Sequence, residues 1–176
     1  MKFLKYHKFG AYHWRWYEDK TSKYTQHVNH VKEWVKEKNT IDIGAGDGLI
    51  MHVLGIRGID NEPSAIMVAK KRGVDIDLGD AYALPYKDEE FDSAYMGDVL
   101  EHLEFPQKAL HEARRVIQKF LYVAAPLKRR GCRIVEEGHY REYSPEDLRK
   151  EIELAGFSTV DIHCRHNTIY GKFQKV

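Results

Sequence analysis

The sequence predicts one α/β domain with helices on both faces of a mostly parallel sheet, and three observations support this class. A β-branched run at 40–43 ends in a glycine-rich turn and continues into an apolar stretch, which indicates a strand, a tight turn and a helix start. Two later runs, 91–96 and 120–125, are typical of buried strands. The chain has 176 residues, which is enough for one such domain, 1–176, with little left for a second.

The composition is typical of a globular protein whose net charge creates no strong electrostatic field. Hydrophobic residues make up 43% and charged residues 31%, and the net charge of +1 gives no general attraction to nucleic acid or to an anionic membrane. Cys132 and Cys164 are far apart and form no C-x-x-C pair, so neither a zinc site nor a disulfide framework is indicated. We expect a cytoplasmic protein with no signal peptide, no spanning helix and no metal.

The first 26 residues mix basic side chains with aromatic ones and show no clear period. The aromatic residues are Phe3, Tyr6, Phe9, Tyr12, Trp14, Trp16, Tyr17 and Tyr24. This segment either caps a ligand cleft and excludes water from it, or packs on the sheet edge as a stabilising arm. Stacking on RNA bases is a less favoured third role. We assign residues 1–38 to an N-terminal arm and helix that cap the cleft, and residues 39–176 to a ligand-binding core.

A helix is predicted from His27, because Val28, Val31 and Val35 recur at helical spacing, and Asn39 suits its end. His27 is one turn from the histidine at position 30, which is a conceivable metal pair. Since no further ligand stands at metal-binding spacing, both histidines are expected on a solvated face.

The glycine-rich turn, residues 40–48, is the most informative stretch. Gly44, Gly46 and Gly48 form G-x-G-x-G, whereas the dinucleotide fingerprint G-x-G-x-x-G needs a glycine where Leu49 stands. Asp42 precedes the turn, and a carboxylate there disfavours a pyrophosphate but attracts a ligand with an ammonium and a sulfonium. The turn therefore favours S-adenosylmethionine over a dinucleotide.

Strands and helices alternate along the rest of the chain. The expected elements are a helix at 48–54, a strand at 56–59, a helix at 64–72, a strand at 74–78, helices opening at Pro106 and Pro145, and strands at 157–163 and 168–173. Asp60 follows the second strand, where it either caps the next helix or binds a ribose at the sheet edge. Asp80 follows the third and is either a turn residue or a ligand contact.

In this order the motifs resemble those of the class I S-adenosylmethionine-dependent methyltransferases, most of all the small single-domain type common in quinone biosynthesis. Asp42 with the three glycines is similar to the first motif, and Gly58-Ile59-Asp60 to the strand end that holds the ribose. Gly79-Asp80-Ala81 resembles the segment beside the adenine, and residues 91–102 resemble the fourth strand and its loop.

The resemblance implies a doubly wound, three-layer Rossmann-like fold with seven strands in the order 3-2-1-4-5-7-6 and the last strand antiparallel. It also implies a set of cofactor-binding residues, namely Asp42, Gly44, Ala45, Gly46, Gly48, Asp60, Asn61, Gly79, Asp80, Ala81, Asp98 and Val99. S-adenosylmethionine is then the cofactor and S-adenosylhomocysteine the product.

Three residues are candidates for accepting a proton from the substrate. Asp98 and His102 leave the fourth strand at the cleft, although His102 could instead cap local backbone while Glu101 faces solvent or a basic residue. His139 lies in a His-x-Arg-x-aromatic run that related methyltransferases often carry near the substrate. A basic cluster follows the fifth strand and is either solvated or recruits an acidic group; it comprises Lys128, Arg129, Arg130 and Arg133.

We therefore expect methyl transfer by direct displacement to a small-molecule acceptor, with an acidic acceptor as one option. The enzyme mainly aligns the nucleophile and keeps water away, so no strong acid or base is required. Methyl transfer to RNA, such as tRNA, or to a protein is the first alternative. A domain that binds the cofactor without catalysis is the second.

Overall fold

The computed structural model describes residues 5–128 and 138–176. Its strands are β1 (Thr40–Ile43), β2 (Arg57–Asp60), β3 (Asp77–Leu78), β4 (Phe91–Gly97), β5 (Ile117–Pro126), β6 (Phe157–Arg165) and β7 (Thr168–Lys175). Its helices are α1 (Lys5–Phe9), α2 (Tyr12–Glu18), α3 (Lys23–Trp34), α4 (Leu49–Leu54), α5 (Pro63–Lys71), α6 (Pro106–Val116) and α7 (Pro145–Leu154), with a 3₁₀ turn η1 (Leu100–His102). Cys132 and three members of the basic cluster, Arg129, Arg130 and Arg133, lie outside the described residues.

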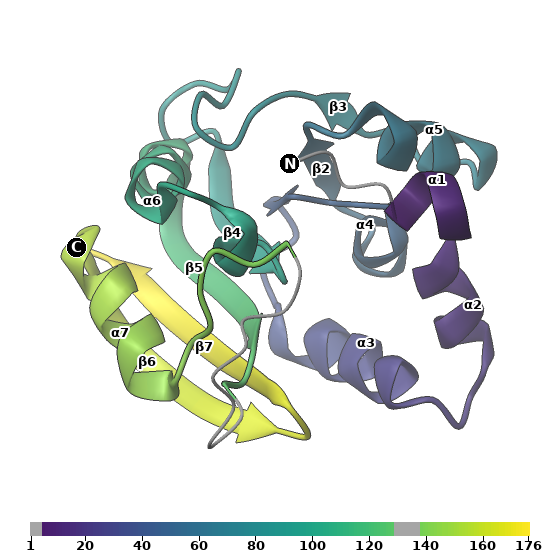
Figure 1. Cartoon of the computed structure of the whole chain (residues 1–176). Helices are drawn as coiled ribbons and strands as arrows, with labels where there is room; N and C mark the ends of the chain where they lie inside the picture. The colour runs from purple at the N-terminus through teal and green to yellow at the C-terminus, as the bar shows by residue number, and fades with distance from the viewer. Residues whose placement is uncertain (1–4, 129–137) are drawn as a thin grey trace.

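The seven strands form one sheet in the order β3-β2-β1-β4-β5-β7-β6, which confirms the predicted α/β class and topology. Strands β1 to β5 pair in parallel, and β7 runs antiparallel to both β5 and β6. Helices α3, α4 and α5 lie on one side of the sheet and α6 and α7 on the other (Figure 1). The carboxyl ends of the parallel strands therefore meet at one edge, where this class of sheet binds ligands.

The alternation of side chains along β5 shows why both faces are covered. Leu121, Val123 and Ala125 point into the core beneath α6 and α7, whereas Tyr122 and Ala124 point into the core beneath α3 and α4. All five are buried. A central strand must therefore be apolar on both faces, which is why its sequence is a continuous hydrophobic run.

Local sequence also sets the helix starts on the α6 and α7 face. The Ser144 hydroxyl accepts a hydrogen bond from the Asp147 N–H while the Asp147 carboxylate accepts one from the Ser144 N–H, which is a capping box. Pro145 occupies the first helical position, as predicted. α6 opens at Pro106, as predicted, and passes directly into β5, which starts at Ile117.

The predicted boundaries of α3 were wrong at both ends. The helix starts at Lys23 rather than His27, because the Ser22 hydroxyl accepts a hydrogen bond of 3.0 Å from the Thr25 N–H and caps the first turn. It ends at Trp34, where Val35 turns extended, well before Asn39.

The strand predicted at 74–78 is also shorter than expected, since only Asp77 and Leu78 pair with β2. Val74 and Ile76 are buried in the core between α3, α4 and the sheet. Their alternation with polar residues therefore reflects the burial of a loop and not the pairing of a β-strand. The hydrophobic period is the same in both cases and does not distinguish them.

The aromatic leader, which has no clear period in its sequence, forms α1 and α2. Tyr6 and Tyr12 stack with ring centroids 5.4 Å apart and pack with Ala65 of α5. Figure 1 shows α1 beside α5 and α2 continuing from α1 toward α3, on the side of the sheet that carries α3 and α4. Within residues 5–128 and 138–176, none of the helices is both long and apolar enough to cross a membrane.

Candidate functional site

The glycine turn after β1 is fixed to the end of β2 by backbone hydrogen bonds. The N–H groups of Gly44 and Ala45 donate to the Ile59 carbonyl at 2.8 and 3.0 Å. Gly44 has a φ of +82°, and a side chain there would collide with Val99, which packs against it from the loop after β4. Glycine is therefore needed at this position for both its backbone angle and the space it leaves. The turn, β2 and Val99 form one packed unit at the carboxyl edge of the sheet.

Asp42 lies on β1 just before this turn and is 2% exposed. Burial is the main reason that its pKa rises from 3.8 to about 8, and the negative charge of Asp60 raises it further. A carboxyl group in this state is protonated at neutral pH, and a cation placed beside it would favour the ionised form. The electrostatic setting thus suits a positively charged ligand group and penalises an anionic one.

Asp60, at the end of β2, faces the glycine turn. One carboxylate oxygen accepts a hydrogen bond from the Gly46 N–H and the other from the Glu62 N–H, each at 2.8 Å. Burial raises the pKa of Asp60, although these two backbone hydrogen bonds oppose the rise. The side chain that caps α5 belongs to Glu62, which accepts from the Ser64 N–H. Asp60 therefore spans the gap between the turn and α5 and is not itself the N-cap.

The segment 79–81 lies beside Asp60. The Gly79 N–H donates to the Asp60 carbonyl at 3.0 Å, which brings the loop after β3 next to the end of β2. The exposed Asp80 accepts from the Tyr82 N–H at 2.9 Å, the turn chemistry considered as its alternative role. Ala81 is half-buried against the core, and Asn61 is exposed next to Asp60.

The two leader helices contact the glycine turn directly. The His13 backbone N–H and ring Nδ1 lie 3.2 and 3.1 Å from the two carboxylate oxygens of Asp47, and the Trp14 indole donates to the Asp47 carbonyl at 2.8 Å. The Tyr6 hydroxyl lies where a side chain on Gly46 would stand. Asp47 is 1% exposed and is the main anchor of this segment, although it was not among the predicted site residues. A carboxylate between two glycines of a buried turn was the available signal, because such a group needs a partner.

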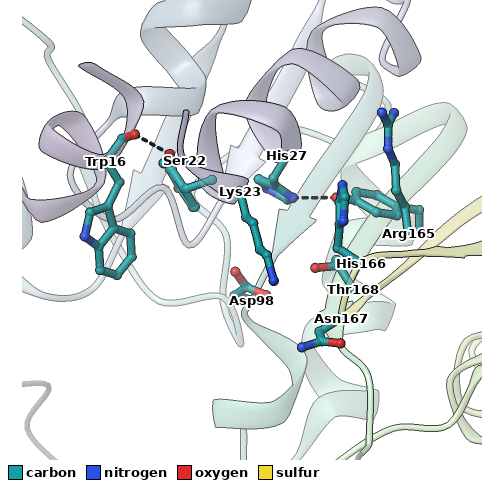
Figure 2. A pocket seen from close by; sticks show the side chains of 11 residues that line it. Trp16, Ser22, Lys23, His27, Asp98, Arg165, His166, Asn167 and Thr168 are labelled. Atoms are coloured by element: carbon teal, nitrogen blue, oxygen red, sulfur yellow. Dashed lines mark hydrogen bonds between the residues drawn. The ribbon is translucent and has the colours of Figure 1, made fainter. Parts of the chain in front are cut away.

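A cavity of about 460 Å³ opens next to this edge. Its walls come from α2, the start of α3, the end of β4 and the β6–β7 turn, and the residues that line it are Trp16, Ser22, Lys23, Tyr24, His27, Asp98, Arg165, His166, Asn167, Thr168 and Tyr170. Figure 2 shows Lys23 and Asp98 pointing toward each other between Trp16 on one side and the β6–β7 turn on the other. The cavity thus combines aromatic walls with charges of both signs.

Asp98, which lines this cavity, has an unfavourable backbone conformation. Its φ is +53°, in the left-handed region that few residues other than glycine adopt, and its N–H donates to the Ala124 carbonyl at 2.8 Å. Strain of this kind is concentrated at functional sites. Of the three predicted proton acceptors, Asp98 lines the cavity, whereas His102 and His139 are not among the described residues that do.

His27 and His30 do not lie on a solvated face, so that expectation was wrong. His27 Nδ1 is 2.7 Å from the Tyr170 hydroxyl, and burial lowers the pKa of His27 to about 4, with the charges of His30 and His13 contributing. His30 Nε2 is 3.0 Å from His163 Nε2 on β6. These two residues join α3 to the β6–β7 hairpin behind the cavity.

His102 and His139 are close together despite their separation in the sequence. Their rings meet edge to face with centroids 4.6 Å apart, and His102 Nδ1 is 2.9 Å from the Gly138 carbonyl, the backbone contact considered as an alternative to catalysis. Glu101 is 1% exposed, which excludes the solvent-facing half of the alternative that it faces solvent or a basic residue.

The β6–β7 turn was the part of the site that sequence analysis missed entirely. Arg165 and Thr168 reach the cavity because β7 inserts between β5 and β6 and brings this turn beside the end of β4. No local motif marks them, because their place depends on the pairing of distant strands. Lys23 was missed for a related reason, namely the misplaced start of α3.

Comparison with known proteins agrees with this arrangement. Residues 41–120 match the family described as a methyltransferase domain. An uncharacterized protein of Methanocaldococcus jannaschii is 29% identical over 113 residues, which cover 64% of this chain and 55% of that protein. Norajmaline N-methyltransferase of Rauvolfia serpentina is 36% identical over 95 residues, which cover 46% of this chain and 32% of the plant protein.

Among solved structures, an S-adenosylmethionine-dependent methyltransferase of Thermotoga maritima, described as a possible histamine N-methyltransferase, is similar over nearly the whole chain. It has a TM-score of 0.80 and 25% identity, covering 97% of this chain and 98% of that one. By contrast, the chain spans about half the length of the Methanocaldococcus relative and about a third of the Rauvolfia one. The match over residues 41–120, the strand order and the similarity along the fold agree with one another, and they identify this part of the chain as a methyltransferase domain of the class I S-adenosylmethionine-dependent type.

Proposed function

We propose that this chain transfers a methyl group from S-adenosylmethionine to a small-molecule acceptor by direct displacement, releasing S-adenosylhomocysteine. The observation that carries the proposal is the cavity of about 460 Å³ that Asp98, directly after β4, helps to line. Its volume falls in the range of about 300–1,000 Å³ that is typical of small-ligand sites. Relatives named for the methylation of small molecules support the same class of acceptor.

The cofactor would lie along the carboxyl ends of β1, β2 and β4. Asp42 would face its ammonium and sulfonium end, Asp60 its ribose hydroxyls and Asp80 its adenine. The complete proposed set is Asp42, Gly44, Ala45, Gly46, Gly48, Asp60, Asn61, Gly79, Asp80, Ala81, Asp98 and Val99. This placement is supported by the contacts of Gly46 and Gly79 with Asp60, which gather three of the four loops at one place.

The acceptor would occupy the cavity, with its nucleophilic atom near Asp98. Lys23 and Arg165 line the walls and suit an acceptor with a carboxylate or phosphate group. Trp16, Tyr24 and the other aromatic walls suit a flat apolar body. Asp98 would orient the acceptor or take its proton, while most of the rate enhancement comes from alignment, about 7–11 kcal/mol in favourable systems.

Residues 1–38 would act as the cap of this site, and residues 39–176 as its core. The contacts of His13 and Trp14 with Asp47 support this role, because they hold the leader on the cofactor turn and not on a remote edge of the sheet. Cap closure would exclude water from the sulfonium. The exposed thiol of Cys164 suits a reducing compartment, the cytoplasm.

Transfer of a labelled methyl group tests the proposal. The protein is incubated with S-adenosylmethionine labelled in its methyl group and with cell extract, which is then separated into metabolites, RNA and protein. Label in the metabolite fraction that depends on Asp60 supports the proposal. Label in RNA or protein would replace it with the corresponding macromolecular methyltransferase. Tight cofactor binding without label in any fraction would indicate a binding domain without catalysis.

A further inference from the structure

Three potential metal ligands meet beside the site, on two segments that are distant in the sequence. Glu101 and His102 lie in η1, shortly after Asp98 at the end of β4, and His139 lies just after Gly138. Each of the three offers one ligand atom, and these atoms all lie within 4.8 Å of one another. We propose that Glu101, His102 and His139 bind a divalent transition-metal ion, with Zn²⁺ as the preferred occupant.

The orientation of His102 fits this role. Its Nδ1 lies 2.9 Å from the Gly138 carbonyl, and since a carbonyl only accepts, Nδ1 carries the hydrogen. Nε2 is then the ring nitrogen that carries the lone pair and is the metal-binding atom in this tautomer. Histidines that bind metals usually donate their second nitrogen to a carbonyl or carboxylate in this way, which fixes the tautomer and the ring plane.

The two segments that carry the ligands are held together by hydrogen bonds to backbone carbonyl groups. The Tyr140 N–H donates to the Glu101 carbonyl at 2.8 Å. The Arg141 guanidinium donates to the carbonyls of Leu100 at 3.1 Å and Glu104 at 3.0 Å, and it also contacts the Leu103 carbonyl. These hydrogen bonds fix the backbone at the ligand positions, in addition to the bond that orients the His102 ring. A metal site of useful affinity needs this kind of prior ordering.

The chemistry of the set favours zinc or a similar borderline ion. Two imidazoles and one carboxylate form a common catalytic zinc set, with bonds of about 2.0–2.2 Å and ligand atoms about 3.3 Å apart. The present limit of 4.8 Å requires the ligand atoms to approach one another by up to about 1.5 Å, which small rotations of the side chains achieve. Glu101 is 1% exposed, and a cation next to a buried carboxylate offsets the cost of its burial. The two histidines are only half-buried, which leaves a path for the ion.

Three protein ligands leave a fourth position open, where water or an acceptor atom can bind. η1 begins two residues after Asp98, so this position lies at the edge of the sheet that also carries the cavity. Metal binding itself does not depend on the proposed methyl transfer and is tested separately from it.

Titration of untagged, metal-stripped protein with Co²⁺ and with Zn²⁺ tests the site. Co²⁺ reports a site of low coordination number by its visible absorption, and Zn²⁺ is measured by competition with a coloured chelator. All proteins carry Cys164→Ser, because the exposed thiol of Cys164 is a separate zinc ligand. The test variants are His102→Ala and His139→Ala. The matched control is His111→Ala, since the Nδ1 of the exposed His111 also contacts a backbone carbonyl, that of Gln107.

We expect one equivalent of metal in the parent protein and in His111→Ala. Each test variant should lose affinity by more than about 100-fold, beyond the 10–100-fold that loss of an outer hydrogen bond costs. Thermal unfolding followed by circular dichroism identifies a variant that fails to fold. Titration of the parent protein tests the proposal even without the variants. If the parent protein binds no stoichiometric metal at micromolar concentration, the proposal is overturned. Unchanged binding in folded His102→Ala and His139→Ala would overturn it as well.

Discussion

The carboxylate of Asp60 accepts a hydrogen bond from the Gly46 N–H across 2.8 Å and so ties the end of β2 to the glycine turn after β1. Its second oxygen accepts from the Glu62 N–H, which positions the start of α5. One acidic side chain therefore holds the walls on both sides of the proposed ribose position. Stability and cofactor binding should be coupled at this residue.

Replacing Asp60 by alanine should weaken S-adenosylmethionine binding at least about tenfold, or ~1.4 kcal/mol, because the ribose contact is lost. The same change leaves two backbone donors without this acceptor and should lower the free energy of unfolding by about 1–3 kcal/mol. Isothermal titration and urea unfolding measure the two effects. Asp75→Ala, an exposed aspartate outside the proposed site, is the control and should change the unfolding free energy by no more than about 0.5 kcal/mol. Unchanged cofactor affinity in Asp60→Ala would remove the ribose role.

Asp42 should make the cofactor-free protein less stable as the pH rises. Its pKa is 3.8 in an ordinary setting and about 8 in the fold, so the folded state binds more protons than the unfolded state between these values. The contribution to stability is fully present below about pH 4 and is lost progressively up to about pH 8.

Asp42→Asn removes this penalty, and each pKa unit is worth about 1.4 kcal/mol. The variant should therefore be more stable than the parent at pH 8, by at least about 2 kcal/mol, with a much smaller gap near pH 5. Urea unfolding of both proteins at the two pH values measures the gap. A gap of the same size at both values would contradict the protonated state of Asp42.

Trp16→Ala should weaken acceptor binding without changing cofactor affinity, because Trp16 lines the cavity and is not among the proposed cofactor residues. Loss of one aromatic wall should raise the KM for the acceptor by about tenfold, as for a stacking contact of 1–3 kcal/mol. Phe9→Ala is the matched control, since Phe9 is an aromatic of the leader with a similar exposed fraction, 45% against 49%, and does not line the cavity. Equal effects of the two substitutions would argue against a cap that binds the acceptor.

Asp98→Gly should separate the effect of backbone strain at this residue on stability from the effect of its carboxylate on methyl transfer. Glycine adopts the φ of +53° without strain, and this gain offsets the larger entropy of glycine in the unfolded chain, so the free energy of unfolding should change by no more than about 1 kcal/mol. Methyl transfer should drop by about 100-fold if the carboxylate takes a proton. Asp98→Asn keeps the size and the hydrogen-bonding capacity, and full activity in this variant would leave Asp98 with an orienting role only. Full activity in Asp98→Gly would exclude both roles.

Much of the fold followed from local sequence. The glycine turn, the buried run of β5 and the helix start at Pro145 each depend on a few neighbouring residues, and each was predicted correctly. The errors occurred where distant contacts decide. Val74 and Ile76 are buried in a loop, and the helix start at Lys23 depends on the cap formed by Ser22.

The residues of the proposed site also fall into two groups, those whose position follows from local sequence and those whose position depends on distant contacts. Asp42, Gly46 and Asp60 belong to motifs that follow successive strands, so their meeting at one edge could be predicted from strand order. Arg165 reaches the cavity only through the pairing of β7 with β5 and β6, and the meeting of His102 with His139 depends on contacts between two loops. Neither arrangement has a signature in local sequence.

Calorimetric titration with S-adenosylmethionine and with nicotinamide adenine dinucleotide, at pH 6 and pH 8, tests the central role of Asp42 most directly. A cation that ionises Asp42 displaces its proton, so the affinity for S-adenosylmethionine should rise by up to about tenfold per pH unit until the pKa near 8 is reached. Asp42→Asn should bind weakly and without this pH dependence, and the dinucleotide should not bind. Tight dinucleotide binding, or unchanged S-adenosylmethionine affinity in Asp42→Asn, would contradict the selection of a cationic methyl donor by this buried carboxylate.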